Sequence, residues 1–312
     1  MRPGQTEWTM LEVGTGTDHS LSVDVFLARG SQPTPLALLT AGVHGDEYEG
    51  PDALATIARM LPEEDLLGSV IVLPVANPMA FTEARRLTPI DGKNLARCFP
   101  GCRDSSPTER LAHAIFESFV RPSTHVIDLH SGGVDYIFAP VAGFYGSPRG
   151  QEASYDAARR FGLDRLWQLP ETKGVLSCEA WKLGKTSIGC EYLGAGQLSS
   201  EGSEAYVRGI LSCLAYWRIL RGREFLPQDG KPYENDWQLA DADGLFHSQA
   251  QIGADVLAGD VVAVASDFRG NTVQTFVAKT EGVVLGLRSK AWLRKGDWGV
   301  LIGQPCHQED HD

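Results

Sequence analysis

Residues 36–47 read LALLTAGVHGDE, and this stretch decides the fold prediction. Its first part, 36–39, is short, continuous and apolar, which is typical of a strand buried on both faces of a sheet. The turn that follows is polar and contains glycine, and it carries His44 and Glu47. We therefore expect both side chains at the carboxyl end of a buried strand.

A second segment repeats this pattern downstream. Residues 124–129 predict another buried strand, and His130 begins the loop that leaves it. Open α/β sheets place their sites at the carboxyl ends of strands. Two imidazoles and one carboxylate are the three protein ligands of a catalytic zinc site whose fourth position is open. His44, Glu47 and His130 therefore predict a metallohydrolase with one zinc ion per chain.

Each segment taken alone has a simpler explanation. The HGDE sequence at 44–47 is also typical of a solvated turn, and His130 of a strand-end histidine that is satisfied by hydrogen bonds. The two segments together, with the charged residues described below, favour the metal site.

Composition limits the possible partners. The 312 residues carry 28 basic and 40 acidic side chains, a net charge of −12. An acidic chain without a basic stripe disfavours nucleic acid and anionic membranes as partners. No stretch approaches the roughly 20 apolar residues that span a bilayer, and residues 1–10 are polar. Six cysteines scattered through a chain of this length predict reduced thiols, so we expect a cytoplasmic protein.

The sequence has two regions that differ in their pattern of predicted elements. Up to residue 225, strand-like and helix-like runs alternate, which favours an α/β sandwich with a mostly parallel or mixed sheet. The runs are 69–75 and 124–129 for strands, and 108–120, 151–161 and 204–220 for helices. From Gly244 onward, short β-type runs separated by glycine turns predict a small all-β domain. The predicted domains are 1–226 (catalytic α/β) and 227–312 (β).

Three further charged residues are candidates for the chemistry. Arg86 and Arg97 flank the loop-like segment 88–95. A hydrolase of acylated amino acids needs one guanidinium near the scissile carbonyl and another for the substrate carboxylate, although two surface arginines are the simpler explanation. Glu191 ends the probable strand 186–190. A lone glutamate there is more often a salt-bridge partner, but beside a zinc-bound water it is the expected general base and proton shuttle.

Several motifs, taken in order, carry a family resemblance. They are AGVHGDE at 41–47, Asn77-Pro78 followed by Arg86, PIDGKNLARCFPG at 89–101, DLHSGG at 128–133, and Glu191. This set resembles the succinylglutamate desuccinylase/aspartoacylase family of the zinc carboxypeptidase clan. The resemblance covers nearly the whole chain, including a carboxy-terminal β domain. It is nearest to bacterial predicted deacylases, which include deacetylases of N-acetylated diamino acids such as N-acetyl-diaminobutyrate.

The resemblance implies a zinc-carboxypeptidase-like α/β/α sandwich and a role for each site residue. Glu191 matches the glutamate that activates the metal-bound water and later protonates the leaving amine. Arg86 matches the arginine that polarises the scissile carbonyl, and Arg97 the one that grips the substrate carboxylate. The positions of the zinc ligands fall on His44, Glu47 and His130.

One position departs from the family pattern. The family usually has Asn directly before the second arginine, and Ala96 stands there in this chain. That change removes a hydrogen-bond donor to the substrate carboxylate. Asn94, or a residue from another loop, is left to compensate, so Asn94 joins Arg97 as a predicted substrate-binding residue.

The carboxy-terminal region has its own resemblance. Residues 254–263 and 295–297 resemble the turns of barrel-sandwich folds similar to biotinyl and lipoyl carriers. Such carriers present a lysine at a hairpin tip, and the candidate tip at 267–270 has none. We therefore expect this domain to shape the mouth of the site or to form a contact of a homo-oligomer.

The sequence thus predicts a zinc-dependent hydrolase that cleaves the amide bond of a small N-acyl amino acid. Two alternatives stay open, a metallocarboxypeptidase that acts on peptides and a non-catalytic binding protein on the same fold. A domain that narrows the site would disfavour the peptidase. The presence of all the metal-ligand candidates and of Glu191 favours catalysis over binding alone.

Overall fold

The computed structural model describes residues 1–14, 20–147, 152–222, 227 and 230–306. The α-helices are α1 (Glu49–Met60), α2 (Pro78–Thr82), α3 (Pro107–Ile115), α4 (Ala153–Phe161), α5 (Leu176–Lys182) and α6 (Ser200–Tyr216). Short 3₁₀ turns lie at Leu61–Glu63 and Leu95–Arg97.

The strands fall into two groups along the chain. Those before residue 200 are β1 (Thr6–Gly14), β2 (Ser20–Ala28), β3 (Leu36–Thr40), β4 (Ser69–Leu73), β5 (His125–His130), β6 (Tyr136–Phe144), β7 (Arg165–Gln168) and β8 (Thr186–Gly194). Those after it are β9 (Pro232–Leu239), β10 (Gly244–Ser248), β11 (Asp255–Val256), β12 (Val261–Ser266), β13 (Thr272–Val277), β14 (Gly282–Arg288), β15 (Trp292–Leu293) and β16 (Trp298–Pro305).

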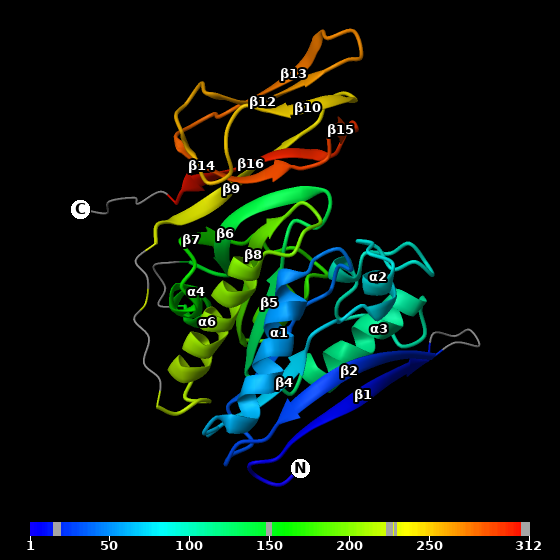
Figure 1. Cartoon of the computed structure of the whole chain (residues 1–312), viewed down its shortest axis with the longest axis vertical. Coiled ribbons are helices and arrows are strands. Elements are labelled where there is room, and N and C mark those ends of the chain that lie inside the picture. The colour runs from blue at the N-terminus through cyan, green and yellow to red at the C-terminus, as the bar shows by residue number, and fades with distance from the viewer. Residues whose placement is uncertain (15–19, 148–151, 223–226, 228–229, 307–312) are drawn as a thin grey trace.

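A 12-stranded mixed sheet runs through the molecule (Figure 1). Its strand order is β1-β2-β4-β3-β5-β8-β6-β7-β9-β16-β14-β11. The strands β4, β3, β5 and β8 pair in parallel, so their carboxyl ends meet at one edge. The neighbours β2 and β6 pair antiparallel to this group. The observed fold is therefore mixed α/β, as the alternation of the sequence predicts.

Helices cover both faces of the parallel strands. Successive side chains of a strand point to opposite faces, and β3 shows the effect. Leu38 belongs to the apolar cluster that contains Leu111 of α3, whereas Leu39 belongs to the one that contains Leu54 of α1. Both leucines are fully buried. This two-sided burial explains why 36–39 is apolar without alternation, and it confirms that prediction.

The predicted helices are present with shifted ends. α3 stops at Ile115 and a π-helical turn, Phe116–Val120, continues it. α6 begins four residues before the predicted start at 204, because the Ser199 side chain accepts a hydrogen bond from the Gly202 amide and caps the helix. The predicted start of α4 at 151 lies outside the described residues, and the observed helix begins at Ala153.

All described elements from Pro232 onward are strands, in agreement with the short β-type runs predicted from Gly244 onward. Four of them, β9, β16, β14 and β11, extend the large sheet, while β13, β12, β10 and β15 form a second sheet above it (Figure 1). β9 pairs in parallel with β7, and β14 pairs with β6. The carboxy-terminal strands are thus hydrogen-bonded into the central sheet, a continuity that the sequence did not predict.

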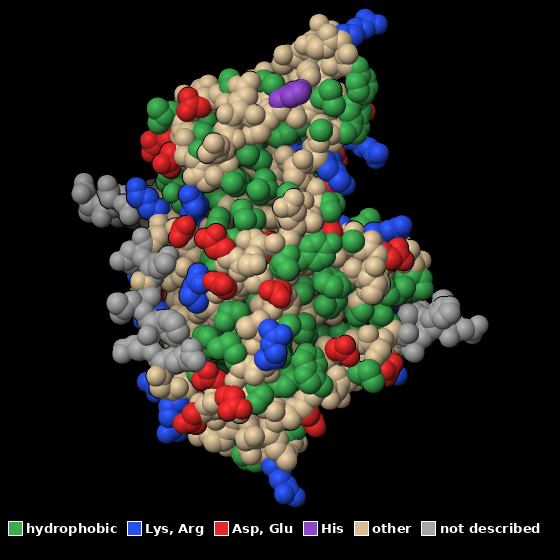
Figure 2. Space-filling model, in the orientation of Figure 1, with side chains coloured by type: hydrophobic (Ala, Val, Ile, Leu, Met, Phe, Trp, Pro, Cys, Tyr) green, Lys and Arg blue, Asp and Glu red, His purple; other side chains and the backbone are tan. Residues whose placement is uncertain are grey.

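The distribution of surface charge agrees with the absence of a basic stripe in the sequence. Figure 2 shows acidic and basic side chains interspersed over one face, without a patch of a single sign. Within the described part of the chain, no helix combines the length and the apolar character needed to cross a membrane.

Candidate active site

The parallel strands bring the predicted site residues to one edge of the sheet. Thr40 at the end of β3 pairs with Asp128 of β5, and His130 at the end of β5 pairs with Glu191 of β8. The loop after β3 carries His44, just before α1 begins. Residues that are far apart in the sequence therefore meet at the carboxyl ends of β3 and β5. Glu191 was expected to end its strand, but β8 continues to Gly194, because its pairing with β6 extends beyond its pairing with β5.

The loop after β3 is held tightly in place. A side chain at Gly45 would place its Cβ 2.0 Å from the carbonyl carbon of Ala80, so only glycine lets the loop pack directly on α2. The Asp46 carboxylate accepts a hydrogen bond of 2.9 Å from the Val134 amide and ties this loop to the one after β5. These contacts fix the positions of the flanking His44 and Glu47.

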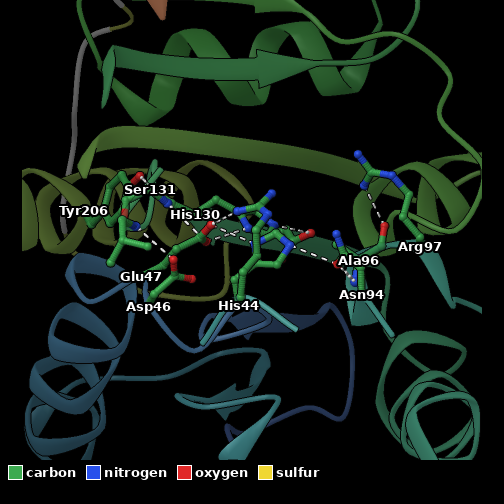
Figure 3. A network of polar contacts seen from close by, with 12 residues as sticks. His44, Asp46, Glu47, Asn94, Ala96, Arg97, His130, Ser131 and Tyr206 are labelled. Atoms are coloured by element: carbon green, nitrogen blue, oxygen red, sulfur yellow. Dashed lines mark hydrogen bonds and ion pairs between the residues drawn. The ribbon is translucent and has the colours of Figure 1, made fainter. Parts of the chain in front are cut away.

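His44, Glu47 and His130 form one compact group (Figure 3). One Glu47 oxygen lies 2.7 Å from His44 Nδ1, and the other lies 3.0 Å from His130 Nδ1. One ligand atom from each of the three lies within 4.8 Å of the others. Two imidazoles and a carboxylate at this spacing match the donor set of a catalytic zinc site. The residues present therefore fit the metal that the sequence predicts.

Each imidazole has an oxygen near its Nε2, a hydrogen-bond partner for His44 and an ion-pair partner for His130. His44 Nε2 lies 3.0 Å from the side-chain oxygen of Asn94, and His130 Nε2 lies 3.2 Å from Asp128 Oδ2. Such partners fix the tautomer and leave Nδ1 free to bind a metal. Sequence reasoning missed this role for Asp128, although the strand period of two places it on the same face of β5 as His130.

Burial and charge set the protonation of the group. Burial, aided by the charge of Arg86, lowers the pKa of His44 to about 4 and keeps its imidazole neutral. Burial opposes ionisation of Glu47, but His44 and His130 outweigh it and hold the pKa of this carboxyl well below its usual range. For His130, burial is outweighed by Asp128 and Glu47, which raise its pKa well above the ordinary value. A divalent cation would take the place of that His130 proton on binding.

Arg86 and Arg97 both line the cavity next to this group. Arg86 Nη1 lies 3.1 Å from Glu47 Oε1, so Arg86 is ion-paired with a metal-ligand candidate. Arg97 is partly exposed to solvent, and its Nη1 donates to the carbonyl of Ala96 at 2.8 Å (Figure 3). In the described part of the chain no acidic side chain pairs with Arg97, and burial followed by the charge of Arg86 lowers its pKa. Its guanidinium is available for an anionic ligand.

Glu191 lines the same cavity and is deeply placed. Its Oε2 is buried and has no hydrogen-bond partner. Burial raises the pKa of this carboxyl well above its usual range, against the opposing charge of His130. A buried carboxyl that holds a proton more tightly than usual suits a group that accepts and returns protons near neutral pH.

Asn94 is placed differently from the other predicted site residues. Its side-chain oxygen accepts from the Ala96 amide at 2.9 Å and also lies against His44. Ala96 lines the cavity, whereas Asn94 is not among the described residues that do so. The structure thus places the Asn94 oxygen against His44, and the contact of Asn94 with substrate stays a prediction.

The cavity has a volume of about 390 Å³, within the usual range for small-molecule sites. Its walls come from both parts of the chain. Besides the residues above, it is lined by Asn235 and Trp237 of β9 and by Trp298 of β16. No local pattern in the sequence indicated that these distant residues would reach the site. The carboxy-terminal strands thus form part of the cavity wall.

Comparisons with known proteins agree with this geometry. A family model for the succinylglutamate desuccinylase/aspartoacylase catalytic domain matches residues 33–217. The N-alpha-acetyl-L-2,4-diaminobutyric acid deacetylase of Halomonas elongata is 31% identical over 287 residues, which are 88% of this chain and 83% of that protein.

Solved structures extend the likeness to nearly the whole chain. A product-bound ectoine utilization protein of Ruegeria pomeroyi is 27% identical with a TM-score of 0.86, over 96% of this chain and 94% of that one. An aspartoacylase family protein of Mesorhizobium loti is 29% identical with a TM-score of 0.84, over 98% and 96%. The similarity includes the carboxy-terminal strands.

Proposed function

Because the chain belongs to the succinylglutamate desuccinylase/aspartoacylase family, we propose that it is a zinc-dependent amidohydrolase that removes the acyl group from a small N-acyl amino acid. One observation carries the proposal. A single cavity of about 390 Å³ is lined by two of the metal-ligand candidates, by Glu191 and by two arginines. The substrate named for the Halomonas relative, an N-acetylated diamino acid, belongs to the same chemical class.

His44, Glu47 and His130 would hold the zinc ion, one per chain. When bound, zinc lowers the pKa of a coordinated water and polarises the amide carbonyl. Asn94 and Asp128 orient the two imidazoles so that each presents Nδ1. These two contacts hold the imidazoles in place before substrate arrives.

Glu191 moves the proton. Its carboxylate accepts a proton from the attacking water as the water oxygen bonds to the carbonyl carbon. It then returns that proton to the amide nitrogen as the C–N bond breaks, and the products are a carboxylic acid and a free amino acid. The raised pKa of Glu191 suits the second half of this transfer.

The two arginines divide the binding of charge. Arg86 stands beside Glu47 and stabilises the negative charge that develops on the carbonyl oxygen. Arg97 holds the substrate α-carboxylate. Its guanidinium donates to the Ala96 carbonyl and has no acidic partner among the described residues. The cavity volume of about 390 Å³, with Trp237 and Trp298 in the wall, supports a small substrate over an extended peptide.

We further propose the division of the chain that its sequence suggests. Residues 1–226 would form the catalytic domain, with the α/β/α arrangement of zinc carboxypeptidases, and 227–312 the β domain. The described helices all end by Tyr216, which supports this division, while residue 226 itself lies outside the described residues. A cytoplasmic location is part of the same proposal, supported by six unpaired cysteines.

A hydrolysis screen tests the proposed function. The purified protein, with its metal content measured, is incubated with a panel of N-acyl amino acids and with short peptides. We expect release of free amino acid from members of the first panel and not from the peptides. Hydrolysis of peptides alone would assign a carboxypeptidase, and no hydrolysis by a zinc-loaded protein would leave a binding protein.

A further inference from the structure

Five of the aromatic rings that line the cavity of the proposed active site pack against one another. They come from four strands of the sheet, and we call them the aromatic wall: Tyr136 and Phe138 of β6, Trp167 of β7, Trp237 of β9 and Trp298 of β16. The mechanism proposed above uses none of them.

The wall is one packed surface. Trp237 stacks on Trp298 with ring centroids 4.2 Å apart, and Phe138 meets Trp237 edge to face at 6.2 Å. Trp167 lies 6.2 Å from Trp237 and donates its Nε1 hydrogen to Asn235 Oδ1 at 3.2 Å. Rings that hold one another in this way present a preorganised apolar face to a ligand.

The charges of the cavity disfavour an ammonium group against this wall. Arg86 and Arg97 are both present, and Glu191 is the one acidic side chain among the described residues that line the cavity. Beside the wall, Asn235 Oδ1 already accepts one hydrogen bond, from Trp167 Nε1, which leaves it one lone pair for a ligand. Two guanidinium groups against one carboxyl repel a further cation, so an apolar group matches this wall better than an ammonium group does.

We infer that the aromatic wall binds an apolar, ring-sized group of the substrate. The inference rests on the proposed function and narrows its substrate class to N-acyl amino acids that carry an aromatic group. That group enters either as the amino-acid side chain or as the acyl group, since both flank the scissile amide. Burying a ring against the wall is worth roughly 10- to 100-fold in kcat/KM over a methyl group at the same position.

The test compares matched substrates on the zinc-loaded protein. One arm compares N-acetyl-L-phenylalanine with N-acetyl-L-alanine, and the other compares N-benzoyl-L-alanine with N-acetyl-L-alanine. A third substrate, N-alpha-acetyl-L-2,4-diaminobutyrate, tests a cationic side chain in place of an aromatic one. We expect at least one aromatic substrate to exceed N-acetyl-L-alanine by the factor above, and the arm that does so identifies the source of the ring. Equal rates in both arms, or a higher kcat/KM for the cationic substrate than for either aromatic one, would overturn the inference.

Variants connect the preference to the wall. Trp298→Leu should reduce the aromatic-to-methyl ratio of kcat/KM by about tenfold, and Trp298→Phe should restore most of it because a ring is present again. Trp8→Leu is the matched control, since Trp8 lies exposed on the edge strand β1 and should leave the ratio unchanged. An unchanged aromatic-to-methyl ratio of kcat/KM in Trp298→Leu would contradict binding of the ring by Trp298.

A binding measurement separates this inference from the proposed function. Calorimetric titration of the wild-type protein with L-phenylalanine, benzoate, L-alanine and L-2,4-diaminobutyrate needs no turnover. Tighter binding of an aromatic ligand, lost in Trp298→Leu, would support the wall even if no N-acyl amino acid were hydrolysed. Hydrolysis without any aromatic preference would leave the proposed function intact and refute the wall.

Discussion

His130 and Glu191 stand directly opposite each other on the adjacent parallel strands β5 and β8. Paired positions on neighbouring strands are about 4.8 Å apart and direct their side chains to the same face of the sheet. The strand register therefore places a metal-ligand candidate beside the candidate proton carrier. The positions of His130 and Glu191 are therefore set by the pairing of β5 with β8 and not by a loop.

The metal is the first prediction. The purified protein should contain about one zinc ion per chain, and a chelator should abolish its activity, because neutral imidazoles and a carboxylate leave one position for water. Added zinc should restore the activity and raise the midpoint of thermal unfolding, because it binds only the folded chain. Metal analysis, activity and thermal melts check this, and a demonstrably metal-free preparation with full activity would contradict the mechanism.

Replacing Glu191 with Gln keeps the shape of the side chain and removes the base. We expect the turnover rate to fall by roughly 10²- to 10⁴-fold. The zinc content should stay at the wild-type level, and measuring it is the control. Loss of zinc in Glu191→Gln would make Glu191 a ligand and require a new assignment for Glu47.

Arg86→Ala should act mainly on turnover. A donor that stabilises charge in the transition state is typically worth about 10²- to 10³-fold in kcat. Because Arg86 also contacts Glu47, the zinc content of the variant must be measured alongside its kinetics. A changed KM with an unchanged kcat would show that Arg86 binds the ground state instead.

Arg97→Ala should raise KM, because Arg97 has no acidic partner in the described part of the chain and is free to bind the α-carboxylate. The native enzyme should also use an N-acetyl amino acid far better than its carboxamide. Steady-state kinetics on this pair decide the point. Equal use of acid and amide would mean that Arg97 does not recognise a carboxylate.

Asp128→Asn should weaken the metal site without removing a ligand. Its carboxylate faces His130 Nε2 at 3.2 Å, and losing such a partner typically costs about 10- to 100-fold in metal affinity or activity. Asp135→Asn is the control. Asp135 lies in the loop that follows β5, and it pairs with Lys290 instead of His130. Competition with a zinc-binding dye measures the affinity, and equal affinities in the two variants would exclude a role for Asp128.

The sequence predicted the centre of the sheet and the convergence of the site. A continuous apolar strand followed by a polar turn is a local pattern, so it predicted β3 and β5 together with His44, Glu47 and His130 at their ends. The roles of Arg86, Arg97 and Glu191 stay predictions, although all three line one cavity.

Long-range contacts could not be predicted. Trp237 and Trp298 reach the cavity only because β9 pairs with both β7 and β16, and strand partners so far apart leave no periodic signal in either segment. The contact of Asn94 with His44 likewise depends on the folded path of its loop. The choice of Asn94 as a substrate contact followed from Ala96 alone.

The pairing of β9 with β7 and of β14 with β6 has a practical consequence for expression of the protein. A truncated version that stops at the end of the family match, residue 217, would leave the edge of β7 without its hydrogen-bonding neighbour. Exposed strand edges of this kind template aggregation. The shortened chain would also lack one side of its cavity, so the smallest version that can be soluble and selective must retain the final strands through Pro305.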